Sequence, residues 1–172
     1  WRWGFENSLP EADLSRVLLL GAGGAGSAIA HALLRMQTGR LWIVDEVPQR
    51  ARALAENLAR SYGKERVVCV DEVVTPMAQA TGLVHATPTG MVKVPGVPLP
   101  TRLLRKECWV AEVVYFPLRT ALLEAARVLG CATVDGGTMA VGQAIGAFEL
   151  ITGLRADAQR MNTHFGRLLA GH

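Results

Sequence analysis

Three glycines near the start of the chain are spaced as G-x-G-x-x-G, at Gly21, Gly23 and Gly26. They follow an apolar run at 16–20 and open a segment with helical periodicity. In this context the first glycine allows a tight turn, the second lets backbone amides approach a pyrophosphate, and the third lets the helix pack close to the strand. Free N–H groups at the start of that helix attract an anion. The alternative is a glycine-rich turn that binds nothing. The predicted dinucleotide-binding turn consists of Gly21, Ala22, Gly23, Gly24, Ala25 and Gly26.

An acidic residue ends the next apolar run, where Asp45 lies 19 residues after Gly26. A carboxylate at that place accepts hydrogen bonds from the adenosine ribose hydroxyls. A 2′-phosphate would instead meet the like charges of Asp45 and Glu46, so the sequence favours NAD over NADP as the cofactor. Arg50, five residues further on, is a second candidate contact, with adenine or with a phosphate. The alternative role for Asp45 is a cap for the helix predicted to start at Pro48.

Short apolar runs alternate with longer segments of helical period along the chain. This order predicts an α/β fold, a Rossmann-like doubly wound parallel sheet with helices on both faces. A loop rich in Pro and Gly, 87–100, follows the fourth strand and is long enough to be functional. Strands are predicted at 16–20, 41–45, 66–70, 82–86, within 107–114 and at 132–134. Helices are predicted at 24–36, 48–62, 77–80, 120–129, 135–150 and 157–169.

The length of 172 residues fits one domain with terminal additions, and half of the residues are hydrophobic. We expect a connecting segment at 1–15, the Rossmann domain at 16–153 and a C-terminal helix at 154–172. The net charge is +3, but the basic residues are scattered and no basic run with interleaved aromatic residues occurs, so we expect no nucleic-acid partner. No apolar run reaches the roughly 18 residues of a membrane helix, so we expect no membrane partner.

The three cysteines, Cys69, Cys108 and Cys131, are odd in number and lack CxxC spacing. This pattern predicts reduced, buried thiols in a cytoplasmic protein, and no metal site.

Five stretches occur in an order that is found in one protein family. They are "GAGGAG" (21–26), "RARALA" (50–55), "HATPTGM" (85–91), "VVYFPLRTALLEAA" (113–126) and "DGGTMAVGQAIGAFELITG" (135–153). With these motifs the chain resembles the nucleotide-binding half of the shikimate/quinate dehydrogenases. In that family the second strand usually ends in "NRT", which holds the 2′-phosphate of NADP. Here Asp45, Glu46 and Val47 stand at those positions, which makes the chain similar to the NAD-using quinate/shikimate branch.

The resemblance also implies roles for individual residues. His85 stands where the family usually has Asn, and a packed histidine is favoured there over a catalytic one. For Tyr115 the alternative to a substrate contact is an aromatic residue packed over the core. For Gly136 and Met139 the alternatives to cofactor contacts are a turn glycine and a core methionine. For Gln143 the functional role is favoured, because a glutamine on an apolar helix face is hard to bury unpaired. The implied cofactor contacts are Thr87, Pro88, Val113, Gly136 and Met139, and the implied substrate contacts are Tyr115 and Gln143.

The family further implies an N-terminal domain that binds the substrate carboxylate and supplies a Lys and an Asp for proton transfer. No such pair is found by spacing here, and Lys93 fits a solvated loop residue, so we assign no catalytic residue. The chain is then expected to be the NAD-binding domain of an enzyme that moves hydride between nicotinamide and C3 of a cyclic hydroxy acid, poorly active alone. Alternatives are a dinucleotide-sensing regulatory module, or another Rossmann oxidoreductase such as a glutamyl-tRNA reductase or a methylene-tetrahydrofolate dehydrogenase.

The helix predicted at 157–169 is amphipathic, with Met161, Phe165 and Leu168 on one face. In the family this helix turns back toward the N-terminal domain. We expect this face to lie exposed or to pair with a second copy of the chain in a homodimer.

Overall fold

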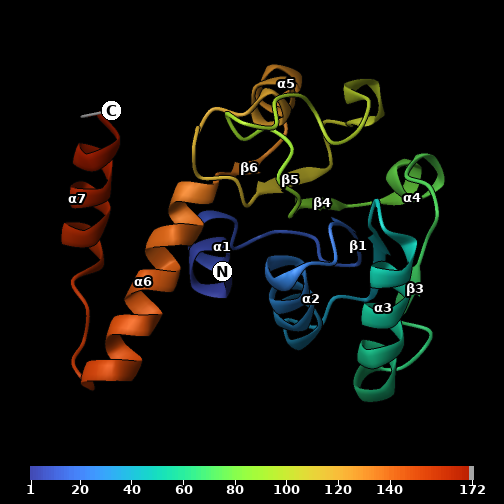
Figure 1. The fold of residues 1–172 in the computed structure, drawn as a ribbon, viewed down its shortest axis with the longest axis horizontal. Helices are drawn as coiled ribbons and strands as arrows, with labels where there is room; N and C mark the ends of the chain where they lie inside the picture. The colour runs from blue at the N-terminus through green and yellow to red at the C-terminus, as the bar shows by residue number, and fades with distance from the viewer. Residues whose placement is uncertain (171–172) are drawn as a thin grey trace.

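A computed structural model describes residues 1–170, which fold around one parallel sheet. The strands are β1 (Arg16–Leu20), β2 (Arg40–Val44), β3 (Val67–Cys69), β4 (Gly82–His85), β5 (Trp109–Glu112) and β6 (Thr133–Val134). Their order across the sheet is β3-β2-β1-β4-β5-β6, and every neighbouring pair is parallel. The predicted doubly wound α/β fold is confirmed, and β1 lies beside β4 at the point where the strand order reverses (Figure 1).

The helices alternate with the strands as predicted, and most bounds agree within two residues. They are α1 (Arg2–Ser8), α2 (Gly24–Arg35), α3 (Pro48–Tyr62), α4 (Val74–Gln79), α5 (Ala121–Leu129), α6 (Gly136–Thr152) and α7 (Ala158–Ala170), with a 3₁₀ turn at Thr101–Leu103. No helix within residues 1–170 combines the length and the apolar character that a bilayer crossing requires.

Capping residues set the ends of α5 and α6. The Thr120 hydroxyl accepts a hydrogen bond from the Leu123 amide at 3.3 Å, and Asp135 accepts one from the Thr138 amide at 2.9 Å. Gly130 ends α5 in the left-handed conformation, with φ of 86°. A side-chain acceptor at the start and a glycine at the end satisfy the unpaired backbone groups of a helix. Helix α6 therefore begins directly after β6, whereas the segment 113–120 separates α5 from the end of β5.

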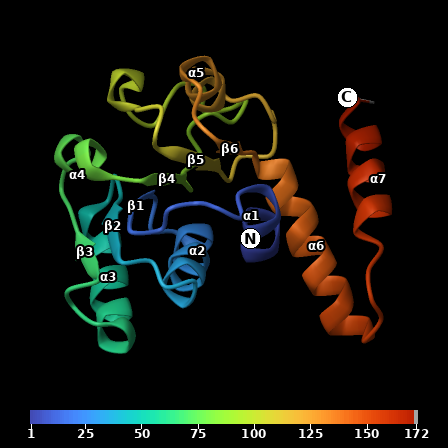
Figure 2. The same ribbon diagram turned by 180° about the vertical axis from the view of Figure 1, so that it is seen from behind.

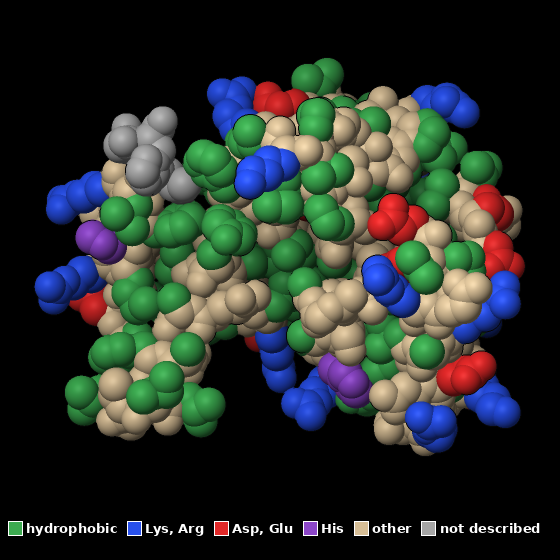
Figure 3. Space-filling model, in the orientation of Figure 1, with side chains coloured by type: hydrophobic (Ala, Val, Ile, Leu, Met, Phe, Trp, Pro, Cys, Tyr) green, Lys and Arg blue, Asp and Glu red, His purple; other side chains and the backbone are tan. Residues whose placement is uncertain are grey.

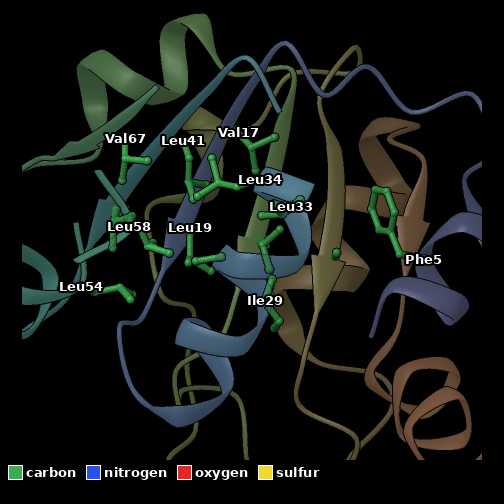
Figure 4. Packing of buried hydrophobic residues seen from close by; sticks show 14 of the residues in the cluster. Phe5, Val17, Leu19, Ile29, Leu33, Leu34, Leu41, Leu54, Leu58 and Val67 are labelled. Atoms are coloured by element: carbon green, nitrogen blue, oxygen red, sulfur yellow. The ribbon is translucent and has the colours of Figure 1, made fainter. Parts of the chain in front are cut away.

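The two faces of the sheet are buried by different helices, because successive strand residues point to opposite sides. Val17 and Leu19 of β1 belong to a core with α2 and α3, as Figure 4 shows from close by. Leu18 and Leu20 belong to the opposite core with α4 and α5. Burial on both faces explains why the central strands read as continuous apolar runs.

The segment expected to be a connection at the N-terminus contains helix α1. Phe5 is buried in the core, stacked on Trp1 and edge-on to Trp109, with 4.8 Å between ring centroids in both pairs. A side chain at Gly4 would lie 2.9 Å from the Thr138 carbonyl of α6. Helix α1 therefore packs closely on α6, beside which it lies in Figures 1 and 2.

The C-terminal helix α7 folds back along α6 at the edge of the molecule (Figure 1). A groove of about 1240 Å³ runs between the two helices, and its lining includes Met161, Phe165 and Leu168. The face expected to be free is therefore turned toward α6: Met161 and Phe165 are half-buried, and only Leu168 is more than half exposed, at 53%. Figure 3 shows hydrophobic side chains along the part of the molecule that α6 and α7 form.

Candidate functional site

The glycine turn joins β1 to α2 with no room for side chains at its two ends. Gly21 has φ of +102°, and a Cβ there would lie 2.6 Å from the Ala86 carbonyl oxygen. A Cβ at Gly26 would lie 1.9 Å from the Gly21 carbonyl oxygen. Only glycine fits at these two positions, so α2 begins directly against the end of β1.

The middle of the turn is open. Ideal Cβ atoms at Gly23 and Gly24 would meet no heavy atom within 4 Å, and both residues are exposed, as is Ala25. Gly23 caps α2 without any side-chain hydrogen bond. No side chain caps the first N–H groups of this 12-residue helix, and the helix dipole adds positive potential there. This is the arrangement into which a pyrophosphate fits.

Asp45 follows β2 and is tied to the glycine turn. Its Oδ2 accepts a hydrogen bond from the Ala22 amide at 2.7 Å, and its Oδ1 accepts one from the Val47 amide at 2.8 Å. The N-cap residue of α3 is Val47, and no side chain caps that helix, so Asp45 does not fill the alternative capping role. The half-buried carboxylate stands beside the turn that would hold the pyrophosphate, with Glu46 and Arg50 exposed next to it.

The other half of the edge is formed by the ends of β4, β5 and β6. Thr87 follows β4, Val113 follows β5, and Gly136 opens α6 after β6. A Cβ at Gly136 would lie 2.2 Å from the Val114 carbonyl oxygen, so the start of α6 presses against the end of β5. Because the carboxyl ends of parallel strands share one edge, the residues predicted to contact the cofactor gather there, with Pro88 exposed in the same loop.

Three other predicted residues lie in environments that bear on their roles. Met139 is 2% exposed and part of the core, which is its alternative role. Tyr115 is 56% exposed, so its alternative role as an aromatic over the core is wrong. Gln143 is exposed. The premise that its side chain is buried on an apolar helix face and needs a partner is therefore wrong. Contacts of all three with cofactor or substrate stay predictions.

A buried polar cluster at this edge was not identified from the sequence as a cluster. His85 ends β4, Glu112 ends β5, and both side chains are fully buried. The Nδ1 atom of His85 lies 2.9 Å from Oε1 and 3.0 Å from Oε2 of Glu112, and its Nε2 atom lies 2.5 Å from the Thr87 hydroxyl. His85 is thus packed and hydrogen-bonded, as the sequence favoured. A signal was present: two polar residues end neighbouring apolar strands, and such residues require partners.

Glu112 is the centre of this cluster. Its Oε1 accepts hydrogen bonds from the amides of Val113 at 2.9 Å and Val114 at 3.0 Å. Its Oε2 accepts one from the Thr120 hydroxyl at 3.1 Å. With His85, the buried carboxylate has four donors, which compensates for its removal from water.

The three cysteines are free thiols, and none adjoins the glycine turn in sequence. Burial raises the pKa of Cys108 to about 12, and burial also raises the pKa of Cys69 and of Cys131. A raised thiol pKa disfavours the nucleophilic thiolate, which argues against a cysteine nucleophile at these positions.

No protein-family model matches the chain. A shikimate dehydrogenase (NADP(+)) of Streptomyces avermitilis is 54% identical over 159 residues, which are 91% of this chain and 55% of that protein. A quinate/shikimate dehydrogenase (NAD(+)) of Corynebacterium glutamicum is 45% identical over 164 residues, which are 94% of this chain and 58% of that protein. The chain thus spans a little over half the length of the curated relatives it matches.

A solved structure agrees with these sequence matches. The quinate dehydrogenase of Corynebacterium glutamicum in complex with NAD superimposes with a TM-score of 0.91 at 44% identity, over 95% of this chain and 59% of that one. By sequence and by fold, the chain is homologous to a part of the shikimate/quinate dehydrogenases, and its own fold is of the Rossmann type.

Proposed function

We propose that this chain binds NAD at the carboxyl edge of its sheet, as the cofactor-binding part of a dehydrogenase acting on a cyclic hydroxy acid of the shikimate or quinate type. The observation that carries the proposal is the open helix start at Gly23 and Gly24 beside the carboxylate of Asp45. One element offers backbone donors for a pyrophosphate, and the other offers acceptors for ribose hydroxyls.

The choice of NAD over NADP rests on charge. Asp45 and Glu46 directly follow β2, where the proposed binding mode would put a 2′-phosphate, and both carboxylates would repel such a dianion. Arg50 is exposed on the first turn of α3 and is the nearest basic residue in sequence. Relatives of both kinds exist, since the Streptomyces avermitilis protein is named for NADP and the Corynebacterium glutamicum protein for NAD. The two acids favour the second kind for this chain.

The nicotinamide would lie along β4, β5 and β6, near Thr87, Val113, Gly136 and Met139. NAD supplies the hydride chemistry when it is bound, and the protein positions it and excludes water. The exposed hydroxyl of Tyr115 and the exposed amide of Gln143 would then bind hydroxyl groups of the substrate. Transfer of hydride between nicotinamide and C3 of that substrate is the activity proposed for the whole enzyme, in the cytoplasm.

A nuclear magnetic resonance titration tests the cofactor site directly. Adding NAD to the labelled chain is expected to shift the backbone amides of 21–26, of Asp45 and of the segment after β4. Adding ADP-ribose is expected to shift the first two groups and spare the third. Shifts confined to the groove between α6 and α7, or no shifts at all, would reject the proposed site.

Self-association is a separate proposal, because three apolar residues near the end of α6 are strongly exposed. Leu150, Ile151 and Leu154 are 87%, 82% and 64% exposed. Exposed apolar surface of this kind favours pairing, here with a second copy of the chain. Light scattering is expected to give a mass that rises with concentration, and a constant monomer mass would refute the homodimer.

A further inference from the structure

The buried cluster around Glu112 links three separate segments of the candidate site. His85 and Glu112 come from neighbouring strands, Thr87 from the loop after β4, and Thr120 from the start of α5. A fully buried carboxylate and imidazole are costly to keep in a core unless each polar atom has a partner. Here each polar side-chain atom of the pair has one, so the cluster forms a closed network.

With Glu112 ionised and His85 neutral, the donors and acceptors set one direction for the hydrogen bonds. The Glu112 carboxylate only accepts, so the Nδ1 atom of His85 carries the proton that it donates to Glu112. The Thr87 oxygen accepts from the Thr89 amide at 3.3 Å, so its own hydrogen is free to be donated to Nε2 of His85. A directed chain therefore runs from the Thr87 hydroxyl through His85 to Glu112.

Both ends of this chain hold parts of the predicted nicotinamide site. At one end the orientation of the Thr87 hydroxyl is fixed. At the other end Glu112 holds the amides of Val113 and Val114, which orients the backbone that leaves β5. The glycine turn and Asp45 make none of these hydrogen bonds. The hydrogen bonds of the network thus reach one half of the site only, and its contact with the other half is the methyl group of Thr87, which would lie 3.1 Å from a Cβ at Gly21.

We propose that Glu112 and His85 are positioning residues that hold the nicotinamide half of the site in its binding geometry without touching the adenosine half. This inference rests on the proposed function, and it adds two residues that sequence patterns did not connect. Its distinctive consequence is selectivity: loss of the network weakens ligands that carry nicotinamide and leaves ADP-ribose unaffected.

The test compares NADH and ADP-ribose on the same protein. NADH fluorescence gives its dissociation constant, and displacement gives that of ADP-ribose. The Glu112→Gln substitution keeps the shape of the side chain but replaces one carboxylate oxygen with an NH₂ group. That group would face the donors that now bind the carboxylate. We expect NADH to bind about tenfold more weakly and ADP-ribose to bind within about twofold of the wild type, since one unsatisfied buried polar group costs about that much.

Two control variants separate positioning from stability. Glu124→Gln removes an exposed carboxylate of α5 that pairs with Arg119 and Arg127, and it should change neither ligand's affinity. Leu122→Ala opens the core under α5, where Leu122 is 1% exposed, and it should lower the melting temperature without changing the ratio of the two affinities. Glu112→Asp keeps the carboxylate but moves it away from His85. It should weaken NADH binding without weakening ADP-ribose binding, and it replaces Glu112→Gln in the test if that variant does not fold.

The outcomes are distinct. Selective loss of NADH affinity in either Glu112 variant supports the inference. If both Glu112 variants lose affinity for NADH and ADP-ribose equally, or keep the wild-type ratio of the two dissociation constants, the inference is overturned. It is also overturned if the wild type binds NADH no more tightly than ADP-ribose. If the wild type binds neither ligand, the proposed function itself fails.

Discussion

Asp45 is the residue on which the choice of cofactor depends. It accepts two backbone hydrogen bonds, from Ala22 and Val47, so its carboxylate is held in place before any ligand arrives. A held carboxylate binds ribose hydroxyls without first losing side-chain freedom. The same fixed charge opposes a 2′-phosphate.

Replacing Asp45 with Asn is expected to weaken NAD binding about tenfold and to reduce the preference for NAD over NADP, because a charge-assisted acceptor is lost and a repulsion is relieved. Asp13→Asn is the matched control, since Asp13 also accepts the amide two residues on, from Ser15 at 2.8 Å, but precedes β1 at the opposite edge. Calorimetric titration measures both cofactors. An unchanged NAD to NADP ratio in Asp45→Asn would contradict this role.

Thiol reactivity tests the packing around Cys108. Because burial raises its pKa to about 12, Cys108 is protonated at pH 8 and offers almost no reactive thiolate. An aromatic disulfide reagent at pH 8 is expected to modify the half-buried Cys69 first and Cys108 only upon unfolding. Mass spectrometry of the partly modified protein identifies the site. Modification of Cys108 in the native protein before Cys69 would show that this core is open.

Residue patterns predicted one half of the site better than the other. The glycine turn and Asp45 follow from local rules, because spacing along one strand–turn–helix unit fixes where they lie. The partnership of His85 and Glu112 depends on β4 pairing with β5 in register, His85 opposite Glu112. The sequence alone contains no such register. The exposure of Gln143 also depends on how α6 lies over the sheet, which its apolar neighbours did not reveal.

At the scale of elements, close backbone approach positions the site. Gly26 lets α2 start against β1, so the open helix start and the strand end form one surface. Gly136 does the same for α6 and β5. These contacts are rigid, because each involves a backbone oxygen rather than a movable side chain.

The Gly26→Ala substitution is expected to lower the melting temperature by roughly 4–10 °C and to abolish dinucleotide binding, because the added methyl overlaps the Gly21 carbonyl. Gly146→Ala is the control: it lies in α6 and its Cβ would meet nothing within 4 Å. Alanine there should leave the melting temperature unchanged or raise it slightly. Calorimetry compares the two variants, and equal stability of both would contradict the packing described for α2.

Most elements could be predicted from sequence, and α1 could not. The alternation of strands and helices follows from apolar runs, capping residues and helix-ending glycines. Gly130 and Gly153 are such glycines, at the ends of α5 and α6. Helix α1 has only seven residues, among them Gly4, and lacks a cap. Short helices are marginal alone, so packing of Phe5 against Trp109 and of Gly4 against α6 decides its structure. Such tertiary contacts are not visible in a local pattern.

At the scale of the whole molecule, the sheet brings two half-sites to one edge, divided between β1 and β4. This arrangement suits a dinucleotide that spans both halves. The chain spans 55% of the Streptomyces avermitilis relative, so a catalytic site of such an enzyme need not lie wholly within it.

The 172-residue chain is expected to turn over shikimate or quinate with NAD at less than a hundredth of the roughly 10 per second of a typical enzyme, because no Lys–Asp pair for proton transfer is identified in it. The absorbance of NADH formed measures the rate. A rate near that of ordinary dehydrogenases would mean that the proton-transfer groups are present in this chain.

The most direct test of the account is a titration of the wild-type chain with NAD and, separately, with NADP. Asp45 and Glu46 beside the open glycine turn predict that both dinucleotides compete for one site and that NAD binds at least about tenfold more tightly, a difference of about 1.4 kcal/mol. Tighter binding of NADP, or no binding of either, would contradict the central claim that this edge of the sheet is an NAD site.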